Sequence, residues 1–265
     1  MMIQNKPALD RPTKGWKADL PLPQTIPEGK LQAIGLPPNF VGDVHLELHV
    51  SRVVNRTVVI LCASIMFLGA LFLSKILLFE FTDLSRYPFV FLLLFGMLVL
   101  GIVAGVAMYR AGVAPPRDEP IRFNRLRRKI YVYRFCAGGP LSRKGWGVRP
   151  VVFNWEDLRA EGWSRMAPTP SGVPIFAWGV DIAVVAPGTN HVIDRFQLAG
   201  SNANGEHLWA MARAFMNQGP EALPKYPHSP RDWNNDVPAF DPALRLAPKV
   251  KWPIDMDRES RTGYG

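Results

Sequence analysis

Two long apolar runs dominate the hydropathy pattern of the chain. Residues 57–74 contain no charged side chain, and neither do residues 88–109. Each run meets the length of about 20 residues that a helix needs to cross the hydrocarbon core of a bilayer. Soluble helices seldom stay apolar on every face over such a length. The pattern therefore predicts two membrane spans, at about residues 57–79 and 88–109.

A short polar segment separates the two runs and contains Glu80, Asp83, Ser85 and Arg86. A chain inside lipid must satisfy every backbone hydrogen bond internally, so it reverses direction only where it reaches water. The segment is therefore expected to form the turn of a helical hairpin. Pro88 falls at the start of the second helix, where its missing N–H costs little.

The cations around the two runs predict the orientation of the hairpin. More of them lie on the outer flanks than in the connecting segment: Arg52, Arg56, Arg110, Arg117 and Arg122, against Arg86 and the borderline Lys75. Positively charged flanks stay in the cytoplasm. Both chain ends are therefore expected there, with the polar turn outside.

Small residues in the second run favour close packing between helices. Gly101 and Gly105 form a small-xxx-small pair of the kind that lets two helix backbones approach each other. The pair is expected to serve the hairpin itself. A homodimer through the transmembrane hairpin is the alternative use of the same residues.

The regions outside the hairpin, which takes residues 53–112, are rich in proline. The sequence has 265 residues, 25 prolines and a formal net charge of +9. Residues 1–52 show little periodicity and are predicted to be a cytoplasmic arm without a core of its own. Residues 220–265 return to this character and are predicted to be an extended tail.

Short strands with alternating polarity follow the second run, within a predicted cytoplasmic domain at residues 118–219. The runs at 121–123 and 130–135 flank a basic turn and predict a β-hairpin. Further strands are expected at 149–154, 158–163, 173–178, 180–186 and 191–198. An amphipathic helix then starts near Asn202 or Asn204 and ends at Gly219, and its apolar stripe is expected to pack on the sheet.

Positive charge is concentrated in the basic turn of this hairpin, in the segment RFNRLRRK. Its cations are Arg122, Arg125, Arg127, Arg128 and Lys129. A cation near an anionic membrane surface gains about 1 kcal/mol, so these residues are candidates for binding lipid headgroups or a partner. Such a cluster could also bind nucleic acid. Because it follows a membrane exit, we expect lipid or protein contact and no nucleic-acid partner.

The sequence contains no catalytic or cofactor-binding signature. It lacks a phosphate-binding glycine loop, a G-x-S-x-G elbow and an H-E-x-x-H motif. Cys62 lies in a span and Cys136 in the domain, so no disulfide is expected. His45 and His49 would share one face of a helix as metal ligands do, but no third ligand accompanies them. We therefore expect a polar pre-membrane segment there, and a non-enzymatic protein without metal, cofactor or catalytic residues.

Three further segments carry a resemblance to known proteins. PIRFNRLRRKIYVYRF, VVFNWEDLRAEGW and GVDIAVV resemble an uncharacterised bacterial family of two-span membrane proteins that are often encoded near type VI secretion effector genes. The order of strands and helix over residues 120–218 resembles the pleckstrin-homology-like (PH-like) fold, an antiparallel barrel capped by a C-terminal helix. The resemblance implies an α+β protein of the bacterial inner membrane, and it carries over no functional residue.

These observations together favour a non-enzymatic protein whose cytoplasmic domain binds a protein partner. The resemblance implies an immunity or accessory factor associated with type VI secretion. Two alternatives stay open. The domain could be an anionic-lipid-sensing module that uses the cations of RFNRLRRK, or the protein could be a membrane-tethered enzyme with a site built from scattered residues.

Overall fold

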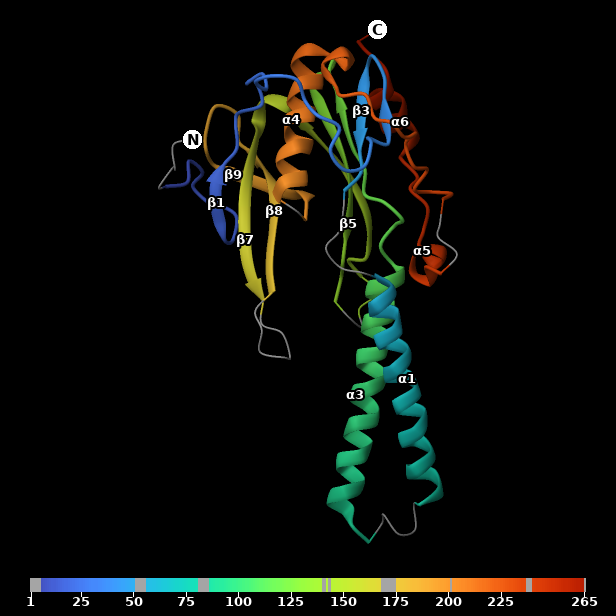
Figure 1. Cartoon of the computed structure of the whole chain (residues 1–265). Helices are drawn as coiled ribbons and strands as arrows, with labels where there is room; N and C mark the ends of the chain where they lie inside the picture. The colour runs from blue at the N-terminus through green and yellow to red at the C-terminus, as the bar shows by residue number, and fades with distance from the viewer. Residues whose placement is uncertain are drawn as a thin grey trace.

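A helical hairpin extends from one end of a domain that contains two antiparallel sheets (Figure 1). The structure is a computed structural model of the chain. It describes residues 6–50, 56–80, 86–139, 142, 144–167, 175–200, 202–236 and 240–264. Arg52, Asp83 and Ser85, on which part of the sequence-based prediction depends, lie outside the described residues.

The hairpin consists of α1 (Arg56–Phe79) and α3 (Pro88–Val113). Both helices are long and apolar enough to cross a membrane, at the positions predicted from the sequence. Pro88 opens α3, as expected for a residue that has no N–H to donate. Large apolar side chains project from both helices, and Leu71 and Phe89 are 65% and 78% exposed. Lipid is the environment that such a surface suits, because water penalises exposed apolar area.

Glycines on α3 bring the two helices into contact. A Cβ at Gly105 would lie 2.9 Å from the Phe67 ring of α1, and a Cβ at Gly101 would lie 3.7 Å from the Met66 carbonyl oxygen. The structure thus places both glycines at the interface within the hairpin. The homodimer alternative stays a prediction.

Five strands form one sheet, two of them before the helical hairpin in the sequence and three after it. Their order in the sheet is β2-β3-β4-β5-β6. The bounds are β2 (Phe40–Val41), β3 (His45–Leu48), β4 (Ile121–Asn124), β5 (Lys129–Cys136) and β6 (Gly147–Asn154). The predicted hairpin around the basic turn is confirmed, because Asn124 pairs with Lys129 and Ile121 with Val132.

The second sheet has four strands in the order β1-β7-β8-β9. They are β1 (Trp16–Asp19), β7 (Leu158–Ala167), β8 (Ile175–Val185) and β9 (Val192–Ala199). The separate strands predicted at 173–178 and 180–186 are one strand, and residues 173 and 174 lie outside the described part. Gly179 does not break β8. It makes room for the Trp163 ring, with which an added Cβ would clash.

Helix α4 (Asn202–Gln218) lies between the two sheets and packs against β7, β8 and β9 on one side and β3 and β4 on the other (Figure 1). Trp209 and Phe215 of this helix are buried, and the Trp209 ring packs on Trp155 with centroids 5.1 Å apart. The predicted stripe therefore fills the core. Neither sheet closes into a barrel, in contrast to the expectation from the sequence, because α4 and these rings hold the two sheets apart.

The N-terminal arm is more regular than expected. It supplies β1 to one sheet and β2 and β3 to the other, and Leu46 and Leu48 of β3 are fully buried. The segment that includes His45 is therefore a core strand and not a polar pre-membrane segment. Between these strands the arm crosses α4, where the Trp209 indole N–H donates to the Pro21 carbonyl oxygen at 2.8 Å.

The C-terminal tail also contains helices, where an extended segment was expected. The short helix α5 (Pro242–Leu246) lies against α1 and α3, and α6 (Ile254–Arg261) lies against β4 and β5. The Asn124 amide donates to the carbonyl oxygens of Ser260 and Thr262, at 3.0 and 2.9 Å. Polar contacts thus hold α6 in place. Its sequence has no apolar stripe that would have predicted a packed helix.

Candidate functional site

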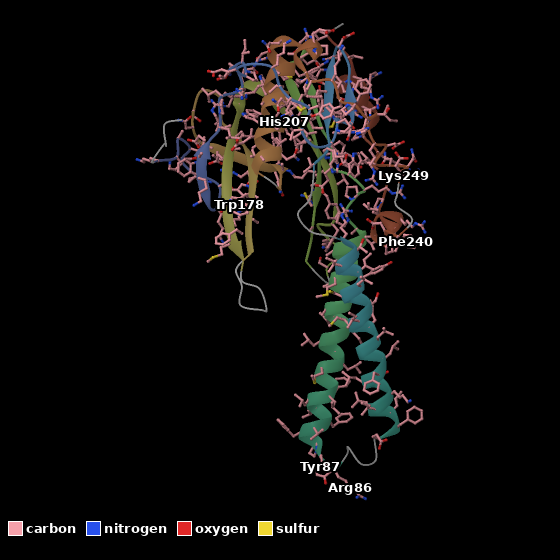
Figure 2. The ribbon with its side chains drawn as sticks, in the orientation of Figure 1. Arg86, Tyr87, Trp178, His207, Phe240 and Lys249 are labelled. Carbon is pink, nitrogen blue, oxygen red and sulfur yellow. The ribbon has the colours of Figure 1, made fainter. Side chains whose placement is uncertain are left out.

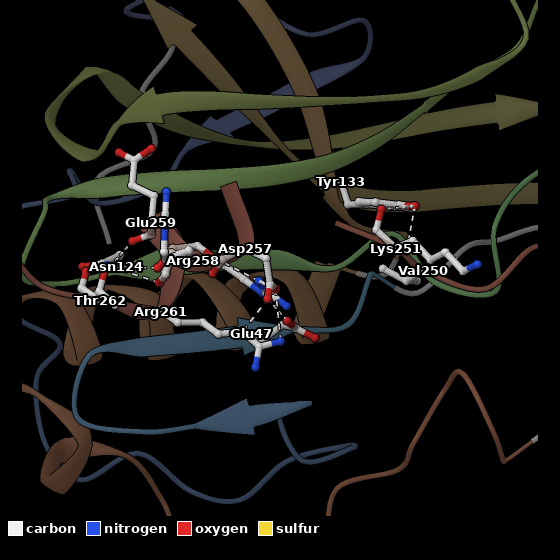
Figure 3. A network of polar contacts seen from close by, with 12 residues as sticks. Glu47, Asn124, Tyr133, Val250, Lys251, Asp257, Arg258, Glu259, Arg261 and Thr262 are labelled. Carbon is white, nitrogen blue, oxygen red and sulfur yellow. Dashed lines mark hydrogen bonds and ion pairs between the residues drawn. The ribbon is translucent and has the colours of Figure 1, made fainter. Parts of the chain in front are cut away.

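The cations predicted to bind lipid or a partner contact other parts of the chain. Arg122 is buried, and its guanidinium donates to the carboxylates of Glu47 at 2.5 Å and Asp257 at 2.6 Å (Figure 3). It also donates to the Ser260 hydroxyl at 2.9 Å, and it lies 4.5 Å from the ring centroid of Trp252. Arg122 therefore joins β3, β4 and the tail.

The cations of the turn itself are held in a similar way. Arg127 donates to the carbonyl oxygens of Thr262 and Gly263, and Lys129 pairs with Glu259 at 2.8 Å. Arg128 pairs with Glu156 at 2.8 Å. The guanidinium of Arg125 lies against the backbone of Gly219. Most of the local positive charge is thus neutralised within the chain.

The basic turn also lies far from the helical hairpin. Arg127 contacts the last residues of the chain, and Figure 1 shows α6 and the C-terminus at the end of the domain opposite to α1 and α3. A bilayer that contained the two helices would be on the other side of the domain. This geometry disfavours headgroup binding by the turn.

A cleft of about 670 Å³ opens between the edge of the five-stranded sheet and the tail. We call it the tail cleft. Three separate parts of the chain line it: the β2–β3 hairpin with Asn39, Phe40, His45 and Glu47, the entry to β4 with Asp118, Pro120 and Arg122, and the tail with Pro230 to Asn234, Val250 to Trp252, Asp257 and Arg261.

Stacked rings form much of the wall of the tail cleft. The His49 ring, just beyond β3, stacks on Trp233 with centroids 3.8 Å apart, and its Nδ1 lies 2.7 Å from Asp118 Oδ1. The His45 ring stacks on Phe40 at 4.5 Å. Burial, and next the charge of Arg122, lowers the pKa of His45 to about 4, so this ring is neutral at physiological pH.

The tail cleft carries charges of both signs. Glu47 and Asp257 pair with Arg122, and hydrogen bonds led by the Asn235 amide lower the pKa of Asp232, so this carboxylate is negatively charged. Arg231 and Lys251, in contrast, pair with no carboxylate of the described residues. The backbone N–H of Lys251 donates to the Tyr133 hydroxyl at 3.0 Å, which fixes this part of the tail (Figure 3).

A second depression, of about 410 Å³, adjoins the tail cleft. We call it the proline groove, because its walls are residues 37–41 and the segment from Pro220 to Pro230. Asn39, Phe40 and Pro230 line both depressions, so the two adjoin at Phe40. The strand β2 between them is the edge of its sheet, and Phe40 and Val41 are 47% and 42% exposed.

The other candidate residues do not assemble into a site. His45 and His49 contact different partners, and the part of the chain that the structure describes has no group of three His, Cys, Asp or Glu side chains placed to hold a metal ion. Cys62 and Cys136 are both free thiols.

One family model matches the chain. It describes DUF6708, a family of unknown function, and it matches residues 98–264, which is more than half of the sequence. The chain belongs to this family. No curated protein and no solved structure matches the chain. The DUF6708 region starts within α3 and contains every element from β4 to α6, while β1, β2 and β3 precede it. The tail cleft thus combines DUF6708 residues with a hairpin from outside the matched region.

Sequence reasoning missed the tail residues of this site. Trp233, Lys251 and Trp252 lie in a proline-rich segment without periodicity, which predicted an extended chain. The two tryptophans in that segment could have revealed it, because disordered, solvent-exposed tails rarely contain large aromatic side chains.

Proposed function

We propose that this protein is a non-enzymatic, membrane-anchored module that binds a protein partner through the tail cleft and the proline groove. The observation that carries the proposal is that these two depressions adjoin at the exposed edge strand β2, where Phe40 lines both. An elongated groove beside an edge strand suits an extended peptide better than a compact small molecule.

The side chains that line the tail cleft and the proline groove also indicate the chemistry of the partner. Aromatic and proline side chains along its walls favour an extended segment, because such a segment offers side chains at regular intervals. Arg231 and Lys251 have no carboxylate partner in the described residues, so they favour acidic side chains in that segment. We therefore assign an extended, acidic segment of a protein partner to this site.

The anchor positions the groove relative to the bilayer. We infer that α1 and α3 span the bacterial inner membrane with both chain ends in the cytoplasm, because the cations lie on the outer flanks of the two helices. The domain is tied to the anchor at its base. The Thr57 hydroxyl donates to Asp241 beside α5 at 3.1 Å, and Arg56 donates to the Pro115 carbonyl oxygen at 3.0 Å.

The finer form of the proposal relates the domain to the PH-like fold and makes the partner an effector or a component of type VI secretion. The protein would then act as an immunity or accessory factor. The sequence resemblance supports this form, as does the order of strands followed by α4. A deletion strain with unchanged toxin sensitivity and unchanged secretion contradicts the finer form and leaves the binding proposal standing.

Photo-cross-linking in cells of the natural host tests the binding proposal. The photoreactive residue p-benzoylphenylalanine replaces Phe40 in the full chain, and in a matched control it replaces Leu22, which is similarly exposed but lies away from the groove. We expect an adduct with another protein from position 40 that position 22 does not give. Equal adducts from both positions, or none from position 40, overturn the proposal.

A further inference from the structure

The β7–β8 ribbon carries an exposed apolar cluster close to the last described residues of the two strands, which we call the aromatic tip. It consists of Met166, Phe176 and Trp178, which are 65%, 50% and 51% exposed. Met166 pairs with Phe176 and Ser164 pairs with Trp178, so the three apolar side chains lie on one face of the ribbon. The two rings stack with their centroids 6.0 Å apart.

The core of the domain does not explain these side chains. Val180, Ile182 and Val184, farther along β8, are buried against α4 and the neighbouring strands. The apolar character of β8 continues beyond that core to Trp178 and Phe176, where nothing in the described chain covers it. An exposed cluster of large apolar residues of this kind marks a contact with another surface.

The aromatic tip lies at the end of the domain from which the helices extend. In Figure 1 the arrow of β7 runs in the direction in which the helical hairpin extends and ends near the level at which α1 begins. Figure 2 shows Trp178 on this lower part of the β7–β8 hairpin. Trp146, outside the tip, also lies near the start of the helices, because the guanidinium of Arg110, in the last turn of α3, lies 4.6 Å from its ring centroid.

We propose that the aromatic tip inserts into the headgroup region of the bilayer that α1 and α3 span. Tryptophan is suited to this region because its ring combines apolar area with an N–H donor, and phenylalanine and methionine add apolar area that the boundary with the acyl chains can bury. The proposal rests on the membrane anchoring proposed above, but not on the tail cleft or its partner. When the tip contacts the bilayer in addition to α1 and α3, the domain cannot rotate freely about the two helices.

The charge next to the tip is held within the domain. Arg165 precedes Met166 in β7, so its side chain starts on the opposite face of the strand. Its guanidinium donates to the Lys14 carbonyl oxygen, the Thr13 hydroxyl and the Asp181 carboxylate, and it lies 4.1 Å from the ring centroid of Trp163. The contact with lipid is therefore assigned to the apolar side chains alone.

Site-specific quenching by spin-labelled lipid tests this inference on the full chain. In a background with Cys62→Ser and Cys136→Ser, a bimane fluorophore is attached to Met166→Cys, to Leu71→Cys on α1 or to Ile254→Cys on α6. The protein is reconstituted in vesicles of phosphatidylethanolamine and phosphatidylglycerol that carry nitroxide on the headgroup or the upper acyl chain. We expect strong quenching at positions 166 and 71 and none at position 254, which is exposed but lies at the far end of the domain.

The outcomes separate this inference from the proposed anchoring. Quenching at position 71 without quenching at 166 overturns the membrane contact of the tip and leaves the anchor intact. Absence of quenching at both positions overturns the anchor itself. A blue-shifted bimane emission at 166 without quenching shows that protein covers the tip, and this also overturns the proposal. In the double variant Phe176→Ser, Trp178→Ser we expect loss of quenching at 166, with quenching at 71 unchanged.

Discussion

The Nη1 atom of Arg122 lies 2.6 Å from Oδ1 of Asp257, which joins the first strand after the helical hairpin to the last helix of the chain. The same guanidinium bonds Glu47 on the strand before the hairpin. One buried cation therefore connects three segments that the sequence separates widely. It also fixes the floor of the tail cleft, because all three residues line it.

Removing one partner of this cation should destabilise the domain. The change Asp257→Asn leaves Arg122 buried with only Glu47 as its carboxylate, and a buried donor that loses its acceptor costs about 1–3 kcal/mol of unfolding free energy. Thermal unfolding of the purified protein in detergent measures the effect. The matched control is Asp255→Asn on the same helix, whose side chain is 94% exposed and should be neutral. Equal melting temperatures for the two variants would contradict this role of Asp257.

Stability should fall when the pH is lowered from 6.5 toward 4. The pKa of His45 is about 4 in the folded protein, mainly because the ring is buried, and 6.5 is its ordinary value. Between these values the unfolded chain binds a proton that the folded chain does not bind. The free energy of unfolding therefore decreases by at most ~1.4 kcal/mol for each unit of pH lost in this window.

The variant His45→Gln checks this assignment. Urea unfolding at several pH values gives the slope of stability against pH for both proteins. We expect a shallower slope between pH 4 and 6.5 in the variant, whatever its absolute stability. Parallel slopes would show that other groups produce the pH dependence.

The helical hairpin should tolerate a large side chain at Gly96 but not at Gly105. The change Gly105→Leu introduces a side chain against Phe67 and should cost about 1–3 kcal/mol through overpacking. The control Gly96→Leu is on the same helix, where a Cβ meets nothing within 4 Å. Resistance to unfolding by SDS compares the two variants. Similar resistance would mean that the helices do not pack as described.

Neutralising the basic turn should affect stability more than lipid binding. Arg127 and Lys129 contact the end of the chain and Glu259, on the side of the domain away from the helices. The double variant Arg127→Gln, Lys129→Gln should therefore melt at a lower temperature. In vesicles with nitroxide on the headgroup, a bimane at Ile254→Cys should stay unquenched both with the native turn and in the double variant. Headgroup quenching at position 254 that the double variant loses, with unchanged melting, would favour a lipid-sensing role.

Local patterns in the sequence predicted the local parts of this fold. The uncharged runs predicted α1 and α3, the alternation around RFNRLRRK predicted the β4–β5 hairpin, and the stripe that contains Trp209 predicted α4. In each case the residues that form the element are neighbours in the sequence, so its periodicity reveals it.

The long-range parts were not predictable in this way. The partner of β3 is β4, and the whole helical hairpin lies between them in the sequence. Leu46 and Leu48 gave a short signal of alternation, but four residues are too few to identify a core strand. The tail cleft was missed because Phe40, Asp118 and Trp233 meet only in the folded chain, and because hydrogen bonds to Asn124 hold α6 where no apolar stripe does.

The most direct test of partner binding is the yield of the photo-cross-link from position 40 after charge reversal in the tail cleft. The double variant Arg231→Glu, Lys251→Glu is compared with Lys17→Glu, an exposed lysine on β1 of the other sheet. The account predicts loss of the cross-linked partner in the double variant and an unchanged yield with Lys17→Glu. An unchanged yield in the double variant, in a protein that melts normally, would contradict it.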